Sequence, residues 1–253
     1  MRANPVNTSD TNTSFSSQAG LPLRDSVALV TGASRGIGLA IARQLIVLGA
    51  KVAICGRDPA RLKETAAELS HSGEVLAHAA DVTRASEVEQ LVRAAESRFG
   101  PISILVNNAG IGLFGPVQER SEEDWNRVLD TNLKSVFLVS RAVIPGMMRR
   151  GSGDIINISS LAGRNAFAGG ALYCASKWGL QGFTACMAED LRGHGIRVAS
   201  VLPGSVATSF SGSKPKDPAK ALAPEDVAHA VAMLLTQRPR SFISEVQLRP
   251  LQK

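Results

Sequence analysis

The stretch "VALVTGASRGIG", residues Val27–Gly38, decides the fold, because a short β-branched run leads into a glycine-rich turn and then into a helical pattern. Two interpretations of the turn are open. The segment Gly32–Gly36 matches G-x-S-x-G, the turn in which a hydrolase presents a nucleophilic serine, here Ser34. The same glycines also suit a turn that brings a diphosphate close to a helix N-terminus.

The position of the turn favours the dinucleotide interpretation. A hydrolase turn needs an oxyanion loop upstream. Here only a polar segment and the first strand precede the turn, and neither His194 nor His229 is flanked by residues typical of a turn at a site. For a dinucleotide, Gly32 permits the tight turn, Gly36 a close approach of the backbone and Gly38 close packing of helix on strand. A tight turn without a ligand is the remaining alternative.

Strand signals alternate with helical patterns along the rest of the chain. The expected strands are 27–31, 51–55, 74–81, 102–110, 153–160, 196–204 and 244–250. This alternation implies right-handed βαβ crossovers and a parallel sheet. We therefore predict an α/β fold with one Rossmann-like, doubly wound sheet of about seven mainly parallel strands and helices on both faces. Ligands of such sheets bind beyond the carboxyl ends of the strands.

Composition excludes several classes of function. The chain has 253 residues, of which 44% are hydrophobic and 20% charged, as in an average globular domain. Its net charge of +6 is scattered, and no run of like charges indicates a nucleic-acid-binding arm. Cys55, Cys174 and Cys186 are widely spaced, and the four histidines lack ligand spacing. We therefore expect no disulfide framework, no metal site and a reduced, cytoplasmic protein.

The N-terminal segment differs from the rest of the chain. Residues 1–22 are rich in Ser, Thr, Asn and Gln and contain no apolar core of a signal peptide. We predict a disordered tail over 1–22 and a single folded domain over 23–253. No apolar run approaches the roughly 18 residues that a transmembrane helix requires.

Three motifs occur in order, each after an expected strand. They are T-G-x-x-x-G-x-G at Thr31–Gly38, N-N-A-G at Asn107–Gly110 and Y-x-x-x-K at Tyr173–Lys177. With them the chain resembles the short-chain dehydrogenase/reductase family over about residues 25–250, and is most similar to its 3-oxoacyl-[acyl-carrier-protein] reductases. The resemblance implies hydride transfer between a nicotinamide dinucleotide and a carbonyl or secondary alcohol. The protein would orient the cofactor and stabilise developing charge.

The Y-x-x-x-K motif has a physical interpretation of its own. Tyr173 and Lys177 are four residues apart on a predicted helix, so their side chains share one face. A free tyrosine has a pKa near 10, and a nearby ammonium favours the phenolate and lowers that pKa. Such pairs also occur on exposed helices without a function. The apolar surroundings of this helix and the resemblance favour an acid–base role for Tyr173.

The resemblance implies two further catalytic residues. Ser160 precedes Tyr173 by 13 positions and would hold the substrate carbonyl; alternation along the strand points its neighbour Ser159 to the other side. Asn132 matches the asparagine that holds a water relay to the lysine in this family. Its alternative role is an amide that satisfies a break in a helix.

The resemblance also implies the cofactor contacts, which lie after five of the expected strands. The diphosphate turn supplies Gly32, Ser34, Arg35, Gly36, Ile37 and Gly38. The adenine lies against Asp81 and Val82, the ribose against Asn108, Ala109 and Gly110, and the nicotinamide against Tyr173, Lys177, Pro203, Gly204, Val206 and Thr208. A helix N-cap is the alternative role for Asp81.

The end of the second strand predicts the choice of cofactor. An acidic residue there binds the ribose 2′-hydroxyl of NAD, whereas arginine accommodates the 2′-phosphate of NADP. Arg57 occupies the expected position, Asp58 follows it, and Arg35 adds a second cation. We predict NADP(H), with NAD(H) as the alternative.

The substrate is less well determined. The loop 209–220 contains Lys214, Lys216 and Lys220, which could bind a coenzyme A phosphate or an acidic acyl-carrier protein, or could simply be solvated. The C-terminal "EVQLRPLQK" differs from that of the acyl reductases. A small-molecule general carbonyl or sugar/polyol dehydrogenase therefore stays open, as does, more remotely, a catalytically silent dinucleotide-sensing protein.

Assembly is expected to follow the family. The resemblance implies a homo-oligomer, commonly a tetramer, assembled through the helical segments 121–150 and 170–193. The first of these is expected to break near Thr131–Asn132 and near Pro145. In the second, Leu180, Phe183, Met187 and Leu191 recur at helical spacing and suit either the core or an interface. No nucleic-acid or membrane partner is expected.

Overall fold

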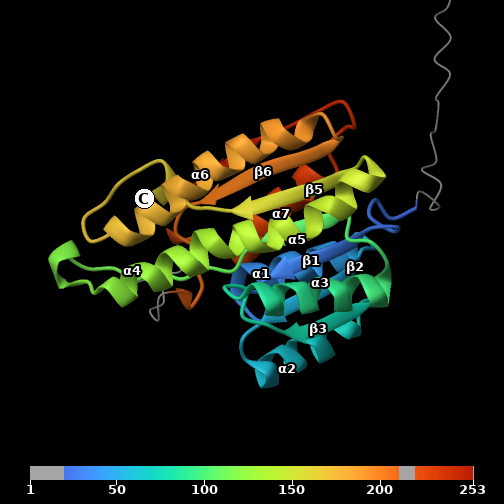
Figure 1. Cartoon of the computed structure of the whole chain (residues 1–253), viewed down its shortest axis with the longest axis horizontal. Coiled ribbons are helices and arrows are strands. Elements are labelled where there is room, and N and C mark those ends of the chain that lie inside the picture. Colours follow the sequence, from blue (N-terminus) through green and yellow to red (C-terminus); the bar gives the residue numbers. More distant parts are fainter. Residues whose placement is uncertain (1–19, 211–219, 253) are drawn as a thin grey trace, which may run out of the picture.

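The computed structural model describes residues 20–210 and 220–252, and its sheet confirms the predicted fold class (Figure 1). Seven strands form one sheet in the order β3-β2-β1-β4-β5-β6-β7, and each neighbouring pair is parallel. The strands are β1 (Val27–Thr31), β2 (Lys51–Gly56), β3 (Val75–Ala79), β4 (Ile104–Asn107), β5 (Gly153–Ile158), β6 (Ile196–Pro203) and β7 (Glu245–Leu248).

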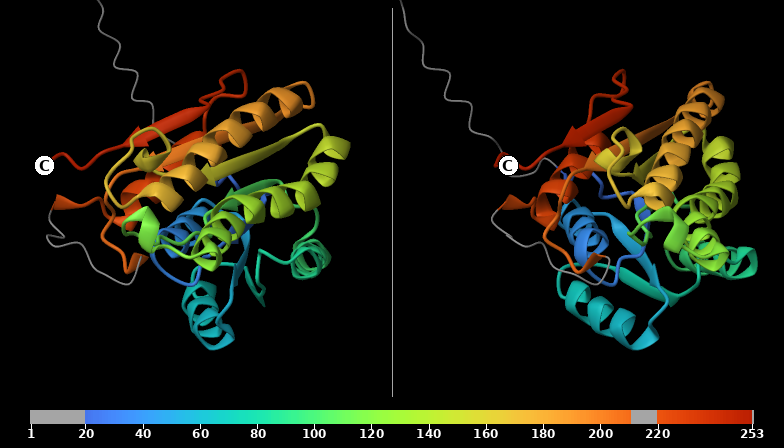
Figure 2. Two further views of the ribbon diagram at one scale, coloured as in Figure 1. Left: turned by 60° about the vertical axis from the view of Figure 1, so that its left-hand side comes forward. Right: turned by 90° about the vertical axis from the view of Figure 1, so that its left-hand side faces the viewer.

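Helices cover both faces of the sheet, as the right-hand view of Figure 2 shows. One face carries α1 (Gly36–Val47), α2 (Pro59–Ser70) and α7 (Pro224–Leu235); the other carries α3 (Ala85–Phe99), α5 (Ser135–Arg150) and α6 (Ala171–Arg192). Successive side chains of β1 pack on opposite faces of the sheet. Val30 belongs to the core under α1 and α7, and Leu29 belongs to the core under α3 and α5. β1 is buried along its whole length, as central strands of parallel sheets are.

The strand order reverses between β1 and β4. After β3 the chain passes through α3 to β4, which pairs with the opposite side of β1, with Leu29 aligned to Leu105. The loops after these two strands therefore leave the sheet in opposite directions and open a crevice at its carboxyl edge. The turn after Thr31 and the loop after Asn107 meet there.

The helical stretch 121–150 differs in part from its prediction. The expected break near Thr131–Asn132 is a π-helical turn, Asp130–Lys134, between α4 (Glu122–Leu129) and α5. The expected break at Pro145 is wrong, since α5 continues through it to Arg150. Pro145 is exposed, so the carbonyl that lacks its amide partner can be solvated.

Most of the segment predicted as a disordered tail, residues 1–19, lies outside the described residues. Leu21 lies over Gly49, and the amide of the buried Leu23 donates to the carbonyl of Leu48 at 2.9 Å. Residues 21–23 thus pack against the end of α1. Within the described ranges, no helix combines the length and hydrophobicity needed to cross a bilayer.

Candidate active site

Two cavities open at the carboxyl edge of the sheet, around the switch point between β1 and β4. The larger, here called the main cavity, has a volume of about 720 Å³, and the small cavity has about 100 Å³. Gly32, Ala109 and Gly110 line both. The two cavities therefore lie next to each other over the ends of the central strands, and together they are called the groove.

Most site residues expected from the sequence line this groove. In the main cavity these are Gly32, Arg35, Gly36, Ile37, Asn108, Ala109, Gly110, Ser160, Tyr173, Lys177, Pro203, Gly204, Val206 and Thr208. In the small cavity they are Arg57, Asp81 and Val82. Ser34, Gly38 and Asn132 line neither cavity. No histidine lines the groove, so Ser34 lacks the base that a hydrolase requires.

The glycine turn is shaped by backbone constraints. Gly32 and Gly36 have φ angles of 64° and 56°, which L-residues with a side chain rarely adopt. A Cβ on Gly32 would lie 2.8 Å from the Cα of Ala109, and one on Gly38 would lie 2.5 Å from the carbonyl oxygen of Gly32. A side chain at position 32 is thus excluded both by the positive φ angle and by the contact with Ala109. At Gly38 a side chain is excluded because α1 packs closely on the turn.

Thr31 and Asn108 fasten the turn to the loop after β4. The Thr31 hydroxyl oxygen accepts hydrogen bonds from the amides of Asn108 and Ala109, both at 3.0 Å. The Asn108 side-chain amide donates in return to the carbonyls of Thr31 and Gly32, at 2.9 and 3.0 Å. Asn108 therefore has a structural role beside its predicted cofactor contact. Thr31 was not among the expected site residues, although its place before the first glycine is the signal that could have identified it.

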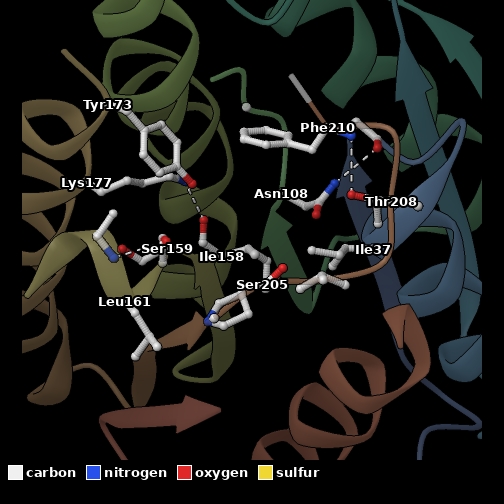
Figure 3. A pocket seen from close by; sticks show the side chains of 18 of the residues that line it. Ile37, Asn108, Ile158, Ser159, Leu161, Tyr173, Lys177, Ser205, Thr208 and Phe210 are labelled. Carbon is white, nitrogen blue, oxygen red and sulfur yellow. Dashed lines mark hydrogen bonds between the residues drawn. The ribbon is translucent and has the colours of Figure 1, made fainter. Parts of the chain in front are cut away.

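Tyr173 and Lys177 lie at the other end of the main cavity, on the first turns of α6 (Figure 3). Burial raises the pKa of Tyr173 to about 12, and a hydrogen bond with Ser160 acts in the opposite direction. The Lys177 ammonium lies 5.8 Å from the centre of the Tyr173 ring and donates to the carbonyl of Ile158 at 2.9 Å. The structure thus does not show the lowered Tyr173 pKa that the sequence predicted, because burial of the phenol has the largest effect on this pKa. Burial lowers the pKa of Lys177 to about 8.

Ser159 and Ser160 both line the main cavity. The Ser160 hydroxyl oxygen accepts from the amide of Ala162 at 3.1 Å. The hydroxyl of Ser159 is buried and has no hydrogen-bond partner within the described part of the chain. β5 ends at Ile158, so both serines follow the strand, and the prediction that Ser159 and Ser160 point to opposite sides stays a prediction.

Asn132 has a positioning role in the described structure. Its side chain accepts from the amide of Ile111 at 2.8 Å and donates to the carbonyl of Ile111 and the hydroxyl of Ser176, at 2.9 and 3.0 Å. The Ser176 hydroxyl donates to the carbonyl of Tyr173 at 2.7 Å. Asn132 therefore connects the loop after β4 with the turn of α6 that carries Tyr173, which agrees with the alternative of an amide at a helix break. Ser176 was missed, and its place beside Lys177 is the available signal.

The small cavity contains a charged group of side chains. Although partial burial opposes the shift, hydrogen bonds from Thr83 and the charges of Arg57 and Arg84 lower the pKa of Asp81. The Asp81 carboxylate accepts from the Thr83 amide and hydroxyl, at 3.0 and 2.8 Å. Its alternative role as the N-cap of α3 is wrong, because the N-cap position is Arg84.

Arg35, at the glycine turn, donates to the hydroxyl of Ser209 at 3.3 Å.

Three aromatic residues near Tyr173 were not expected from the sequence. Phe114, Phe167 and Phe210 come from the loops after β4, β5 and β6 and line the main cavity. No motif includes them, because their shared location depends on how three loops fold over the sheet.

Fold and site together define a class: a doubly wound nucleotide-binding type of domain with a serine, a tyrosine and a lysine at the carboxyl edge of its sheet. The family model described as short chain dehydrogenase matches residues 26–219, and the chain belongs to this family. It is an oxidoreductase of that family.

Relatives match nearly the whole chain. An uncharacterized oxidoreductase of Staphylococcus saprophyticus is 38% identical over 90% of this chain and 99% of its own length. A metagenomic short-chain oxidoreductase, solved in complex with NADP, is 43% identical over 92% of this chain and 100% of its own, with a TM-score of 0.82. The alcohol dehydrogenase of Thermococcus sibiricus, solved with 5-hydroxy-NADP, is 33% identical over 90% and 97%, with a TM-score of 0.85.

Proposed function

We propose that the protein is an NADP(H)-dependent carbonyl reductase, or in reverse a secondary-alcohol dehydrogenase. The observation that carries the proposal is that Ser160, Tyr173 and Lys177 line the same cavity as the glycine turn. A dinucleotide would lie along the groove, and a carbonyl compound would occupy the Tyr173 end.

The groove residues fit such a cofactor. Gly32 lines both cavities, and a Cβ there would fill the space between the turn and Ala109. The turn would hold the diphosphate at the N-terminus of α1, which bears the positive end of the helix dipole. Ala109 and Gly110 would border a ribose, and Asp81 and Val82 the adenine. Solved relatives with NADP and 5-hydroxy-NADP support this assignment.

The chain's own residues supply the proton chemistry. When bound, the nicotinamide supplies a hydride to the carbonyl carbon or removes one from the alcohol. The Tyr173 hydroxyl donates the proton that the carbonyl oxygen takes up, and Ser160 hydrogen-bonds that oxygen. The high pKa of Tyr173 keeps the phenol protonated, as a proton donor must be. Lys177 places a positive charge next to the phenolate that results.

Replacing Tyr173 tests the proposed activity. The Tyr173→Phe variant keeps the ring and removes the proton donor, so we expect turnover to fall by about 10²–10⁴-fold. NADPH consumption with ketones, acyl thioesters and polyols gives the rates, while fluorescence titration of NADPH and the thermal midpoint serve as controls. A wild-type protein that binds NADPH but consumes none with any of these compounds would instead support a dinucleotide-sensing protein.

The preference for NADP(H) rests on Arg57 in the small cavity and Arg35 at the turn. Arg57→Ala should weaken NADPH binding by about 10–100-fold and leave NADH binding unchanged, because a charge-assisted hydrogen bond contributes about 1.5–3 kcal/mol. Arg84→Ala is the matched control, since Arg84 also lies beside Asp81 but lines neither cavity. Equal effects on both cofactors would contradict the assignment.

The proposal also covers the substrate class, the cell compartment and the assembly. A 3-oxoacyl thioester, a sugar or polyol, and a simple ketone are the substrates that the family pattern leaves open. Of the lysines proposed for a carrier protein or coenzyme A, Lys214 and Lys216 lie outside the described residues, and Lys220 is exposed. We further propose a cytoplasmic homo-oligomer. Size-exclusion chromatography with light scattering tests the assembly.

A further inference from the structure

Three phenylalanine rings, called here the ring cluster, surround the Tyr173 end of the main cavity. Phe114 lies edge-on to Tyr173 with ring centres 5.4 Å apart, and Phe210 lies 5.8 Å from Tyr173 at a tilt of 60°. Phe167 lies 5.8 Å from Phe114. Figure 3 shows Tyr173 and Phe210 around the same cavity. The rings come from three separate loops, so the cavity is where these loops converge.

The ring cluster is not part of the folded core. Phe114, Phe167 and Phe210 are 42%, 48% and 37% exposed, although burial of a phenylalanine stabilises a fold by about 1.5–3 kcal/mol. Apolar surface left open around a cavity is typical of a binding site.

The rings occupy space that is free because two nearby residues are glycines without side chains. A Cβ on Gly112 would lie 2.7 Å from Phe114 and 2.8 Å from Phe210, and one on Gly170 would lie 2.6 Å from Phe167. Both glycines have ordinary φ angles, so their absence of a side chain serves these contacts and not the backbone. The local sequence thus makes room for all three rings.

The remaining lining of this cavity limits the chemistry of the substrate. Leu161, Ala162 and Ala166 continue the apolar wall, and among the residues that the structure describes no acidic side chain lines the main cavity. The polar lining residues from the loop after β5 are Ser159, Ser160 and Asn165, and the Asn165 amide already donates to the carbonyl of Leu161 at 3.0 Å. The other polar residues of the lining, besides Tyr173 and Lys177, come from other loops and are Arg35, Asn108, Ser205, Thr208, Ser209 and Arg249. A polyol would leave several hydroxyls without partners there, which is costly. A flat apolar group would instead contact ring faces and edges.

From this geometry we propose that the substrate is an aryl ketone, or its aryl carbinol in reverse, with its aromatic ring in the ring cluster. The inference rests on the carbonyl reductase function proposed above. The ketone carbon gains a hydride, which is two electrons, from the reduced nicotinamide, and its oxygen gains the Tyr173 proton. A proton from solvent then restores the phenol.

The test compares acetophenone with cyclohexyl methyl ketone, which matches it in size but is not aromatic. Both are titrated into the Tyr173→Phe variant loaded with NADPH, so that binding is measured by calorimetry without turnover. We expect acetophenone to bind about tenfold more tightly, since an edge-to-face contact distinguishes an aromatic ring from an aliphatic one. Equal affinities would overturn the inference.

Variants locate the preference in the ring cluster. Phe114→Leu and Phe167→Leu, each in the Tyr173→Phe background, should bring the affinity ratio of the two ketones close to one. Phe137→Leu is the matched control, because Phe137 is similarly exposed, at 43%, but lies on α5 outside the cavity. A ratio unchanged in both cavity variants would also overturn the inference.

Turnover by the wild-type protein separates this inference from the function on which it rests. The expected result is a higher kcat/KM for acetophenone than for an acetoacetyl thioester or a sugar. Higher values for the thioester or the sugar would overturn the aryl ketone and leave the reductase standing. No turnover of any carbonyl compound would overturn the reductase, whereas the ratio of binding affinities would still report on the ring cluster.

Discussion

The two ends of the groove are built in different ways. At the β1–β4 end, the turn Thr31–Gly38 and the loop after Asn107 are joined through backbone groups: the Thr31 hydroxyl accepts from two backbone amides, the Asn108 side chain donates to two backbone carbonyls, and two glycines of the turn have positive φ. At the Tyr173 end, the walls are side chains from three loops, above all the ring cluster. A backbone-built site admits few residue types at fixed spacing, whereas a site built from side chains can change its residues and keep the fold.

The largest effect is expected where the backbone itself is constrained. Gly32→Ala combines an unfavourable φ angle with a Cβ only 2.8 Å from the Cα of Ala109. Strained φ and overpacking cost about 1–3 kcal/mol each, so we expect the free energy of unfolding to fall by about 2–6 kcal/mol. NADPH binding should be lost with it. Urea unfolding and fluorescence titration measure the two quantities.

Gly182→Ala is the matched control for that substitution. Gly182 lies on the exposed side of α6, has no atom near its Cβ position and has no positive φ. Because alanine is the better helix former, stability should rise by about 0.5–1 kcal/mol. If Gly32→Ala and Gly182→Ala changed the free energy of unfolding by the same amount, the φ angle and the close contact at Gly32 would not constrain the turn.

An intermediate effect is expected at Thr31. Thr31→Val keeps the shape of the side chain but removes the acceptor of the Asn108 and Ala109 amides. A buried donor left unpaired costs about 1–3 kcal/mol, so the loss in unfolding free energy should be about 2–4 kcal/mol. Thr236→Val is the control, since that exposed hydroxyl only donates to a carbonyl of α7. If Thr31→Val lowered the free energy of unfolding no more than Thr236→Val, the Thr31 hydroxyl would not be what joins the glycine turn to the loop after β4.

The same contrast explains how much could be predicted from the sequence. The strands and the glycine turn could be predicted, because alternation, glycine and spacing express backbone requirements directly. Gly32 and Gly38 occupy positions where any side chain would collide. A ligand site beyond the carboxyl ends of the strands followed from the alternation of strands and helices, and Arg57, Asp81 and Val82 do line the small cavity beyond β2 and β3.

What the sequence did not predict depends on burial and on contacts between distant residues. Pro145 continues a helix because it faces solvent. Asp81 binds Thr83 and does not cap α3, a choice that depends on where the turn after β3 ends. Phe114 and Phe167 meet only because two loops from neighbouring strands fold together. None of these outcomes has a periodic or short-range signal.

The electrostatic state of Tyr173 is the clearest case of this kind. The i,i+4 spacing predicted a phenol acidified by Lys177, but the buried ammonium donates to Ile158 and the pKa of Tyr173 is raised to about 12. A raised acid pKa means that folding favours the protonated phenol. This contribution to stability is therefore complete below the unfolded pKa near 10 and is lost as the pH rises toward 12.

The smallest expected effect follows from that arrangement. The chain contains one tyrosine, so tyrosinate absorbance reports Tyr173 alone. In the folded protein without cofactor we expect no ionisation below about pH 11, and Lys177→Met should leave this unchanged, because Lys177, whose pKa is lowered to about 8, is already neutral at that pH. The urea-unfolded chain should titrate near pH 10 and provides the reference, with circular dichroism to verify the fold at each pH. A folded midpoint below 10 that rises in Lys177→Met would show instead that the lysine acidifies the phenol before cofactor binds, and the Tyr173 end would then be as preorganised as the glycine turn.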